Sequence, residues 1–260
     1  MTTRRCSRLA TIGLMALACG AAPADAQQVS AQALAQANNP LADLNAVNLQ
    51  DYYVPSFTSS PTSKANTLNV RGVVVTGRQV IRATLPIIAN GTAAGLGDLN
   101  VFDAFLLTRS GARTQFGLGP LLVIPTNTSA PLGAGSSWQL GAAAVLVHPL
   151  SGGSLLGGLL TWQTDVVGGD NRVDTNLGTA QFFATFPIGS GWYVRSSPLA
   201  VLDFQNDRYL VPFGLGIGKV FPVGGAVANV FLEPQVTAFY HGTGNPTLQL
   251  FSGFNLQFGK

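Results

Sequence analysis

Residues 247–258 read TLQLFSGFNLQF, and this stretch decides the class of fold. Apart from Phe251, its large apolar residues occupy one parity and its polar or small residues the other: Leu248, Leu250, Phe254, Leu256 and Phe258 alternate with Thr247, Gln249, Gly253, Asn255 and Gln257. Successive side chains of a β-strand point to opposite faces, so the pattern predicts a strand with one apolar face. At roughly 9 to 11 residues or more, a tilted strand is long enough to cross a bilayer.

The same alternation recurs upstream, in residues 226–238, 209–218, 116–124 and 78–87. The chain is 47% hydrophobic and only 10% charged, yet beyond residue 26 no run approaches the ~18 uninterrupted apolar residues of a membrane helix. Because lipid satisfies no backbone polar group, strands that cross a membrane must close into a barrel. The alternative is a soluble β-sandwich, in which large aromatic residues would favour the middle of a buried face.

Turn signals give the number of strands. Short glycine-bearing turns are predicted at 76–78, 109–112, 150–153, 188–191 and 222–225, and they alternate with longer polar connections at 58–65, 89–97, 125–136, 167–174, 205–207 and 241–246. Outer-membrane barrels alternate short periplasmic turns with longer extracellular loops in this way. We therefore predict an all-β fold: a transmembrane antiparallel up-and-down β-barrel of about 12 strands, with both ends on the periplasmic side.

Aromatic residues on the lipid-facing parity support the barrel over the sandwich. Phe186, Trp192, Phe221 and Phe258 fall at predicted periplasmic strand ends, and Trp138, Trp162, Tyr209 and Tyr240 fall at predicted extracellular ends. Two such belts are typical of the membrane interfaces of a barrel. One segment conflicts with the pattern, because Asp103 shares the parity of the apolar residues around it. A β-bulge, or an inverted register that turns Asp103 inward, would relieve the conflict.

The first 26 residues are predicted to be a signal peptide. Arg4, Arg5 and Arg8 precede an apolar run over 9–22, and Ala24-Asp25-Ala26 forms a small-x-small cleavage site. The apolar run is shorter than the ~20 residues of a membrane helix, which argues against an uncleaved anchor. Cleavage removes three arginines and one aspartate, so the net charge falls from +3 to about +1 and gives no reason to expect a nucleic-acid partner.

Both cysteines, Cys6 and Cys19, lie in this leader, so the mature chain is predicted to contain no thiol. Cys19 before Gly20 also allows a lipoprotein interpretation, but Ala16 stands where such signals usually carry Leu. Export of a barrel without a spanning helix predicts the bacterial cell outer membrane as its location.

Residues 27–45 are rich in Ala, Gln and Asn and too polar to span a membrane. They are predicted to form an N-terminal periplasmic tail or a short plug in the barrel mouth, with the tail slightly favoured. Residues 46–260 are assigned to the outer-membrane β-barrel.

Six segments carry a resemblance to a known family: 39–44 (NPLADL), 95–100 (GLGDLN), 117–126 (GLGPLLVIPT), 169–176 (GDNRVDTN), 195–198 (RSSP) and 216–221 (GIGKVF). They resemble a family of uncharacterised outer-membrane β-barrel proteins that is similar to the meta-pathway phenol-degradation and aromatic-compound transporter-like barrels. The resemblance implies a barrel and transport, and it brings no substrate and no functional residue with it.

Function must then be sought on the inward parity of the strands. The pore-lining candidates are Arg71, Arg82, Arg195, Arg208, Asp203, Glu233 and Gln235. If these groups line water, the excess of arginine should favour anions, and the chain would be a porin-like channel or transporter for small molecules. The alternative is a packed, salt-bridged interior that conducts nothing, in a barrel that serves as a structural or adhesion protein.

An outer-membrane hydrolase is the least favoured function. Such an enzyme needs a histidine beside a nucleophile or carboxylate, and His148 and His241 fall at opposite ends of the predicted barrel. We therefore predict no enzyme activity, no catalytic residue, no metal site and no cofactor. The expected partners are outer-membrane lipid, a small-molecule solute and the outer-membrane insertion machinery, since Gly253, Leu256 and Phe258 resemble its C-terminal recognition signal.

Overall fold

The computed structural model describes residues 29–109 and 112–259. The predicted signal peptide lies outside the described residues. Within them, the strands are β1 (Asn45–Phe57), β2 (Ala65–Thr76), β3 (Gln79–Ala89), β4 (Ala94–Leu96), β5 (Leu99–Leu106), β6 (Gln115–Ile124), β7 (Trp138–Pro149), β8 (Leu155–Val167), β9 (Asn176–Gly189), β10 (Trp192–Ser196), β11 (Leu199–Asp203), β12 (Arg208–Gly214), β13 (Gly216–Val223), β14 (Ala226–His241) and β15 (Pro246–Phe258). The helices are α1 (Ala31–Asn38) and the short 3₁₀ turns η1 (Ala130–Leu132) and η2 (Ser151–Gly153).

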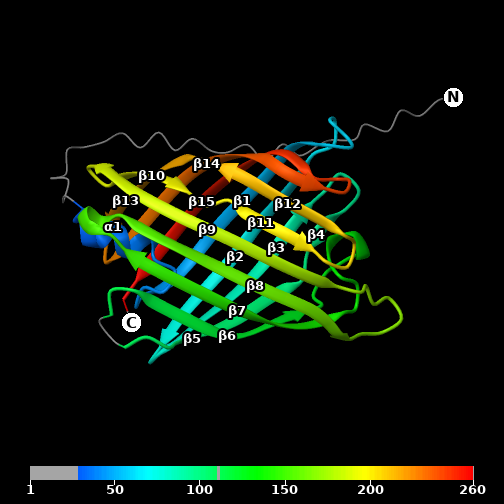
Figure 1. Cartoon of the computed structure of the whole chain (residues 1–260), viewed down its shortest axis with the longest axis horizontal. Coiled ribbons are helices and arrows are strands. Elements are labelled where there is room, and N and C mark those ends of the chain that lie inside the picture. The colour runs from blue at the N-terminus through cyan, green and yellow to red at the C-terminus, as the bar shows by residue number, and fades with distance from the viewer. Residues whose placement is uncertain (1–28, 110–111, 260) are drawn as a thin grey trace.

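These strands form one closed antiparallel barrel, as predicted (Figure 1). Three strands of the wall are interrupted, so that β4 with β5, β10 with β11, and β12 with β13 each act as one, and the wall has 12 strands. The first and last strands, β1 and β15, pair antiparallel from Asn45 opposite Phe258 to Phe57 opposite Pro246, and this pairing closes the sheet into a barrel. Closure leaves no sheet edge with unpaired backbone groups.

The barrel has two different ends. The short turns, α1 and the C-terminal end of β15 lie at one end, which we call the terminal end; the longer connections lie at the other, the loop end (Figure 1). The alternation that the sequence predicts is present along most of the wall, but the connection between β5 (ending at Leu106) and β6 (beginning at Gln115) is as long as the loop between β8 and β9.

The outer face of the wall is apolar. Exposed large side chains include Leu160, Phe182, Phe213, Leu215, Leu232 and Val236, and Phe182 reaches 69% exposure. In β14 the parity is as predicted, since Leu232 is exposed while the next residue, Glu233, is completely buried. A continuous apolar exterior of this kind fits lipid rather than water. None of the helices in the described residues is long and apolar enough to cross a membrane.

The conflict at Asp103 is resolved in a way that the sequence analysis did not expect. The β3–β5 and β5–β6 registers show no shift, and Phe102 and Ala104 are the buried, inward residues, so both proposed remedies are wrong. Asp103 stays on the outward parity near the terminal end. Its Oδ2 accepts a hydrogen bond from Nε2 of Gln79 at 2.7 Å, on the neighbouring strand, while its buried Oδ1 has no partner among the described residues. A partner at a strand end thus replaces a change of register.

The placement of Tyr240 in the outer belt is also wrong. A register irregularity follows Val211 in the β12–β14 pairing, where Val211 pairs with Phe239 and Pro212 pairs with Thr237. The extra residue shifts the parity of the end of β14, so Tyr240 pairs with the inward Leu210, and Phe239, at 68% exposure, faces outward instead. A β-bulge inserts one residue and reverses every side chain beyond it.

Helix α1 sits in the terminal end of the barrel. Ser30 is its N-cap, with Oγ accepting a hydrogen bond from the backbone N of Ala33 at 3.1 Å, and the helix ends before Pro40. A residue that precedes proline is disfavoured in a helix, which is why Asn39 is extended. Leu34 and Ala37 are buried against inward residues of β10 and β13. Residues 29–44 therefore form a plug, and we use that name for them below.

Beyond the helix, the plug crosses the terminal end to the opposite wall. Nδ2 of Asn39 donates to Oε1 of Gln115 on β6 at 2.9 Å, and Leu41 is buried in an apolar cluster formed by inward residues of β2, β3 and β5 to β8. The chain then enters β1, where Oδ1 of Asn45 accepts a hydrogen bond from the backbone N of Val75 at 3.0 Å. The plug therefore touches both sides of the lumen.

Candidate functional site

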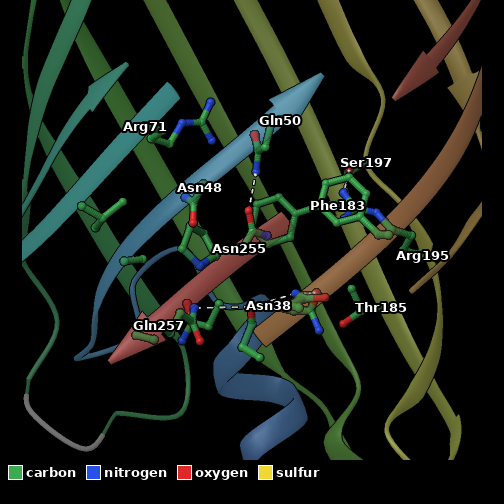
Figure 2. A pocket seen from close by; sticks show the side chains of 18 of the residues that line it. Asn38, Asn48, Gln50, Arg71, Phe183, Thr185, Arg195, Ser197, Asn255 and Gln257 are labelled. Carbon is green, nitrogen blue, oxygen red and sulfur yellow. Dashed lines mark hydrogen bonds between the residues drawn. The ribbon is translucent and has the colours of Figure 1, made fainter. Parts of the chain in front are cut away.

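A cavity of about 150 Å³ lies inside the barrel, directly above the plug (Figure 2). Asn38, Asn39 and Pro40 of the plug form its floor, and inward residues of β1, β2, β3, β9, β10, β14 and β15 form its sides. Figure 2 shows Arg71 and Arg195 on opposite sides of this space, with Asn48, Gln50 and Asn255 between them. The lining is rich in amide and guanidinium groups, which suits water and polar solutes.

Glycines in the wall keep this space open. The rings of Phe183, Tyr193 and Phe231 lie across the glycine of a neighbouring strand, where a Cβ would collide with them: Gly157, Gly218 and Gly253 respectively. Each large inward side chain thus lies along the wall over a position without a side chain. The alternation of apolar and glycine residues that the sequence shows therefore does more than form strands, because it lets aromatic rings pack without filling the lumen.

Arg195 and Glu233 form a buried ion pair. Nε of Arg195 donates to Oε2 of Glu233 at 2.8 Å, and the Glu233 side chain is completely buried. The carboxylate also accepts hydrogen bonds from the backbone N of Ser197 (2.8 Å), from Oγ of Ser197 (3.1 Å) and from Nε2 of Gln235 (3.0 Å). All of its neighbours donate to it, so the negative charge is fully matched.

Two interruptions of the wall create this arrangement. Pro198 has no N–H for the ladder, and the break between β10 and β11 leaves the backbone N of Ser197 free to donate to Glu233. Gly216 pairs with Arg195 on one side and lies against Glu233 on the other, with no side chain to separate them. The RSSP and GIGKVF segments of the sequence thus meet around one carboxylate.

Aromatic rings complete the surroundings of Arg195. Its guanidinium carbon lies 3.6 Å from the ring centroid of Phe231 and 5.3 Å from that of Phe251. The ring of Tyr52 stacks on Phe251 at 4.2 Å between centroids. Cation–π contacts and the ion pair together hold Arg195 in one orientation. Glu233 neutralises the charge of Arg195, so this arginine adds no net charge to the cavity.

Arg71 and Arg82 have different surroundings. They lie on the adjacent strands β2 and β3, and both line the cavity. Nε of Arg71 donates to Oγ1 of Thr84 at 3.1 Å, and the guanidinium of Arg82 lies 4.1 Å above the ring of Phe102. Among the described residues neither has a carboxylate partner, and the buried Nε of Arg82 has no acceptor. These two arginines give the cavity its net positive charge.

The remaining candidates lie elsewhere. Asp203 and Arg208 pair across β11 and β12 near the loop end, where the Asp203 carboxylate accepts hydrogen bonds from Asn206. Gln235 is completely buried beside Glu233 and does not face the open cavity. The seven candidates therefore lie in three places. Arg71, Arg82 and Arg195 line the cavity, Glu233 and Gln235 lie buried behind Arg195, and Asp203 and Arg208 face each other on adjacent strands near the loop end.

Sequence reasoning missed several residues of the site. Tyr193 donates from its hydroxyl to Oδ1 of Asn229 at 2.6 Å, and Nδ2 of Asn229 donates to the plug at Ala37 O and Asn38 Oδ1, both at 3.1 Å. Nε2 of Gln257 donates to the same carbonyl of Ala37 at 3.3 Å. The inward parity of Asn229 and Gln257 was visible in the sequence, but it did not show that their partner would be the N-terminal segment, which was predicted as either a tail or a plug.

A second cavity, of about 390 Å³, lies near the loop end. Its lining includes Asp98, Asp174 and Asp203, so it is more acidic than the cavity above the plug. The loop that carries η1 lines this cavity with Leu132, Gly133 and Ala134. Asp98 holds the loop in place: its Oδ1 accepts hydrogen bonds from the backbone N and Nδ2 of Asn127, and its Oδ2 accepts one from the backbone N of Ala134 at 2.7 Å.

The two histidines are not brought together. Nδ1 of His148 lies 2.8 Å from Oγ1 of Thr114 near the terminal end. His241 lies in the opposite half, with Nε2 3.7 Å from Oδ2 of Asp207 and its ring stacked on Tyr209. Neither pairing includes both a nucleophile and a carboxylate.

The closed wall, apolar exterior and plugged polar lumen define a transmembrane β-barrel of the outer-membrane class. Among solved structures, the chain is similar to an outer membrane channel from Pseudomonas putida F1, with a TM-score of 0.62 and 14% identity over 83% of this chain and 94% of that chain. A bacterial polysaccharide outer membrane secretin gives a TM-score of 0.35 and 9% identity over 84% and 99% of the two chains, too low to support an argument. No family model and no curated protein matches the sequence.

Proposed function

We propose that this chain is a channel or transporter for small molecules in the bacterial outer membrane. The observation that carries the proposal is the cavity above the plug, a polar space inside a membrane-spanning wall with two arginines that no described carboxylate neutralises. A barrel that served only as an anchor would need no such space, and an unpaired cation away from water is costly. Water and solute in the lumen would remove that cost.

The same arginines support a preference for anions. Arg195 is neutralised by Glu233, so the net positive charge of the cavity comes from Arg71 and Arg82. Charge of one sign at a narrow point lowers the entry cost for ions of the opposite sign and raises it for ions of the same sign. The second cavity contains acidic residues, which would oppose an anion. Some of this negative charge is already matched by hydrogen-bond donors, since the Asp98 carboxylate accepts from Asn127 and from the backbone N of Ala134.

Planar-bilayer recording of the purified mature protein tests the proposal. Discrete conductance steps are expected, with a reversal potential in a salt gradient displaced toward the anion equilibrium value. The double variant Arg71→Gln with Arg82→Gln should move this potential toward the cation value. Arg109→Gln, which removes one positive charge from an exposed turn, should leave it unchanged.

A second function, a structural barrel with a packed interior, is favoured by one observation: the plug and the Arg195–Glu233 pair fill part of the lumen. The two functions differ in the bilayer experiment. If correctly folded protein gives no conductance, and variants that release the plug give none either, the channel proposal is wrong and the packed barrel remains.

The other expected partners belong to the same proposal. The apolar exterior would contact outer-membrane lipid, and Leu256 and Phe258 at the end of β15 would be read by the insertion machinery. The sequence resembles an uncharacterised barrel family that is similar to the phenol-degradation and aromatic-compound transporter-like barrels; the resemblance gives no substrate, and small aromatic molecules are the first solutes to test in uptake assays.

A further inference from the structure

We propose that Arg71 and Arg82 form a binding site for a small carboxylate with an apolar body. The inference rests on the proposed function, because it names the kind of solute that the lumen would hold. It begins from two guanidinium groups that are diagonal neighbours on β2 and β3, where Arg71 pairs with Thr84 and Arg82 pairs with Val73.

The two guanidinium groups have donors to spare. Nε of Arg71 donates a hydrogen bond to Oγ1 of Thr84, which leaves the other N–H groups of that guanidinium to donate elsewhere. Nε of Arg82 is buried and has no acceptor in the described residues. Glu233, the carboxylate beside Arg195, already accepts hydrogen bonds from Arg195, Ser197 and Gln235. An oxyanion between Arg71 and Arg82 would supply the missing acceptor, and arginine binds carboxylates through paired N–H donors.

The ring of Phe102 fixes the direction of this donor group. It lies 4.1 Å from the guanidinium carbon of Arg82 and is itself buried. Stacking on a ring occupies one face of the guanidinium and leaves its N–H edge to bind in the plane. The guanidinium of Arg82 is therefore already oriented before a ligand binds, and its Nε is ready to donate to a ligand oxygen.

The apolar part of the ligand follows from the wall beside the arginines. A smaller cavity of about 70 Å³ adjoins Arg71 and Arg82 and is lined by Val73, Val80, Phe102, Val145 and Leu159, with Pro40 and Leu41 of the plug. Inorganic phosphate or chloride would gain nothing from these side chains, whereas an apolar group placed there would leave water. The combination of two arginines and an apolar recess selects an amphipathic anion.

Size limits the apolar body. The apolar recess has about 70 Å³ and adjoins the main cavity of about 150 Å³, and an engineered protein cavity of the latter volume holds one benzene molecule. A monocarboxylate with a body of about six carbon atoms fits the two spaces together, and a long-chain fatty acid does not. Hexanoate and benzoate are therefore suitable probes, one flexible and one flat.

Binding is tested by calorimetric titration of the detergent-solubilised, full mature barrel. Hexanoate and benzoate should bind to one site, while hexanamide, which has nearly the same shape but no charge, should bind at least roughly 10-fold more weakly. Acetate should also bind more weakly, because it lacks the apolar body. Phosphate that bound more tightly than hexanoate would overturn the proposal in favour of a simple oxyanion site.

Variants assign the site to the two arginines. Arg71→Gln and Arg82→Gln should each weaken hexanoate binding by roughly 10- to 100-fold, since each removes charged hydrogen bonds. Arg109→Gln, at an exposed turn, should bind like the wild type and corrects for uptake of the probes by detergent. Arg82→Lys keeps the charge and loses the planar donor pair, so it should give an intermediate affinity. Equal affinity in Arg71→Gln, Arg82→Gln and the wild type would overturn the proposal.

The outcome is independent of the channel experiment. Binding without conductance would keep the carboxylate site and remove the proposed channel. Chloride conductance without any binding of hexanoate or benzoate would keep the channel and remove this site. A melting curve of each variant shows whether a loss of binding comes from unfolding.

Discussion

Replacing Arg195 should destabilise the barrel far more than replacing Arg71 or Arg82, although all three arginines face the same cavity. In Arg195→Met the Glu233 carboxylate keeps its hydrogen bonds from Ser197 and Gln235 but loses its counter-charge. Glu233 has no exposure to solvent that could compensate. Arg71 and Arg82 have no carboxylate partner, so their removal leaves no buried charge behind.

The magnitude follows from the cost of a buried charge. Breaking a buried ion pair by removing one partner typically costs about 3 to 5 kcal/mol, whereas replacing both partners by neutral groups of similar size is often close to neutral. Arg195→Met should therefore lower the free energy of unfolding by about 3 to 5 kcal/mol. Adding Glu233→Gln should recover about 2 to 3 kcal/mol of this loss, so the coupling energy between the two sites should be at least of that size.

The measurement is a denaturant titration of the wild type, the two single variants and the double variant, refolded into the same lipid and followed by tryptophan fluorescence and gel mobility. Arg71→Gln is the control and should cost less than about 1 kcal/mol. If Arg195→Met costs no more than this control, or if the two single losses simply add in the double variant, the ion pair does not stabilise the wall.

Three further predictions concern the wall, the topology and the plug. Gly216→Ser should destabilise the barrel although position 216 faces the lumen, because a Cβ there would collide with the carbonyl oxygen of Leu232; Gly72→Ser, where a Cβ meets nothing within 4 Å, should fold normally in the same titration. On intact cells, a membrane-impermeant thiol reagent should label Asp170→Cys in the loop between β8 and β9 but not Ser151→Cys in η2, and the reverse pattern would invert the topology. A disulfide between Asn38→Cys and Asn229→Cys, whose native side chains are hydrogen-bonded at 3.1 Å, should lower the conductance until a reductant is added; equal conductance before and after reduction would mean that the plug does not gate the lumen.

The sequence predicted the wall well because strand parity is a local property. A period of two over about ten residues, with glycine at each turn, is enough to define the direction of every side chain, and Leu232 and Glu233 face as expected. The same local rule fails wherever one residue is inserted. Nothing in the sequence around Ala238 distinguishes a regular strand from the bulge that turns Tyr240 inward, since the bulge depends on the pairing with β12.

The candidate site was predictable in composition and not in its pairings. Parity placed Arg71, Arg82, Arg195 and Glu233 on the inner face, but it could not tell which of the arginines Glu233 would neutralise. That choice depends on strand register, because Gly216 stands between Arg195 and Glu233 on an intervening strand. For the same reason strand parity shows only that position 216 faces the lumen, whereas the structure leaves it no room for a side chain.

The two ends of the lumen are held by different kinds of contact. At the loop end, the carboxylate of Asp98 accepts hydrogen bonds from Asn127 and from the backbone of Ala134, and charged hydrogen bonds contribute about 1.5 to 3 kcal/mol each. At the terminal end, Asn229 and Gln257 donate neutral amide hydrogen bonds to the carbonyl of Ala37, at about 0.5 to 1.5 kcal/mol each, and Leu34, Ala37 and Leu41 of the plug are buried in apolar clusters. Burial of one leucine side chain contributes about 1.5 to 3 kcal/mol, so hydrogen bonds alone do not decide which end opens. Cross-links decide it: a moving plug predicts that the Asn38–Asn229 disulfide lowers the conductance and that a cross-link in the loop around η1 does not, and the opposite result would identify the loop as the moving part.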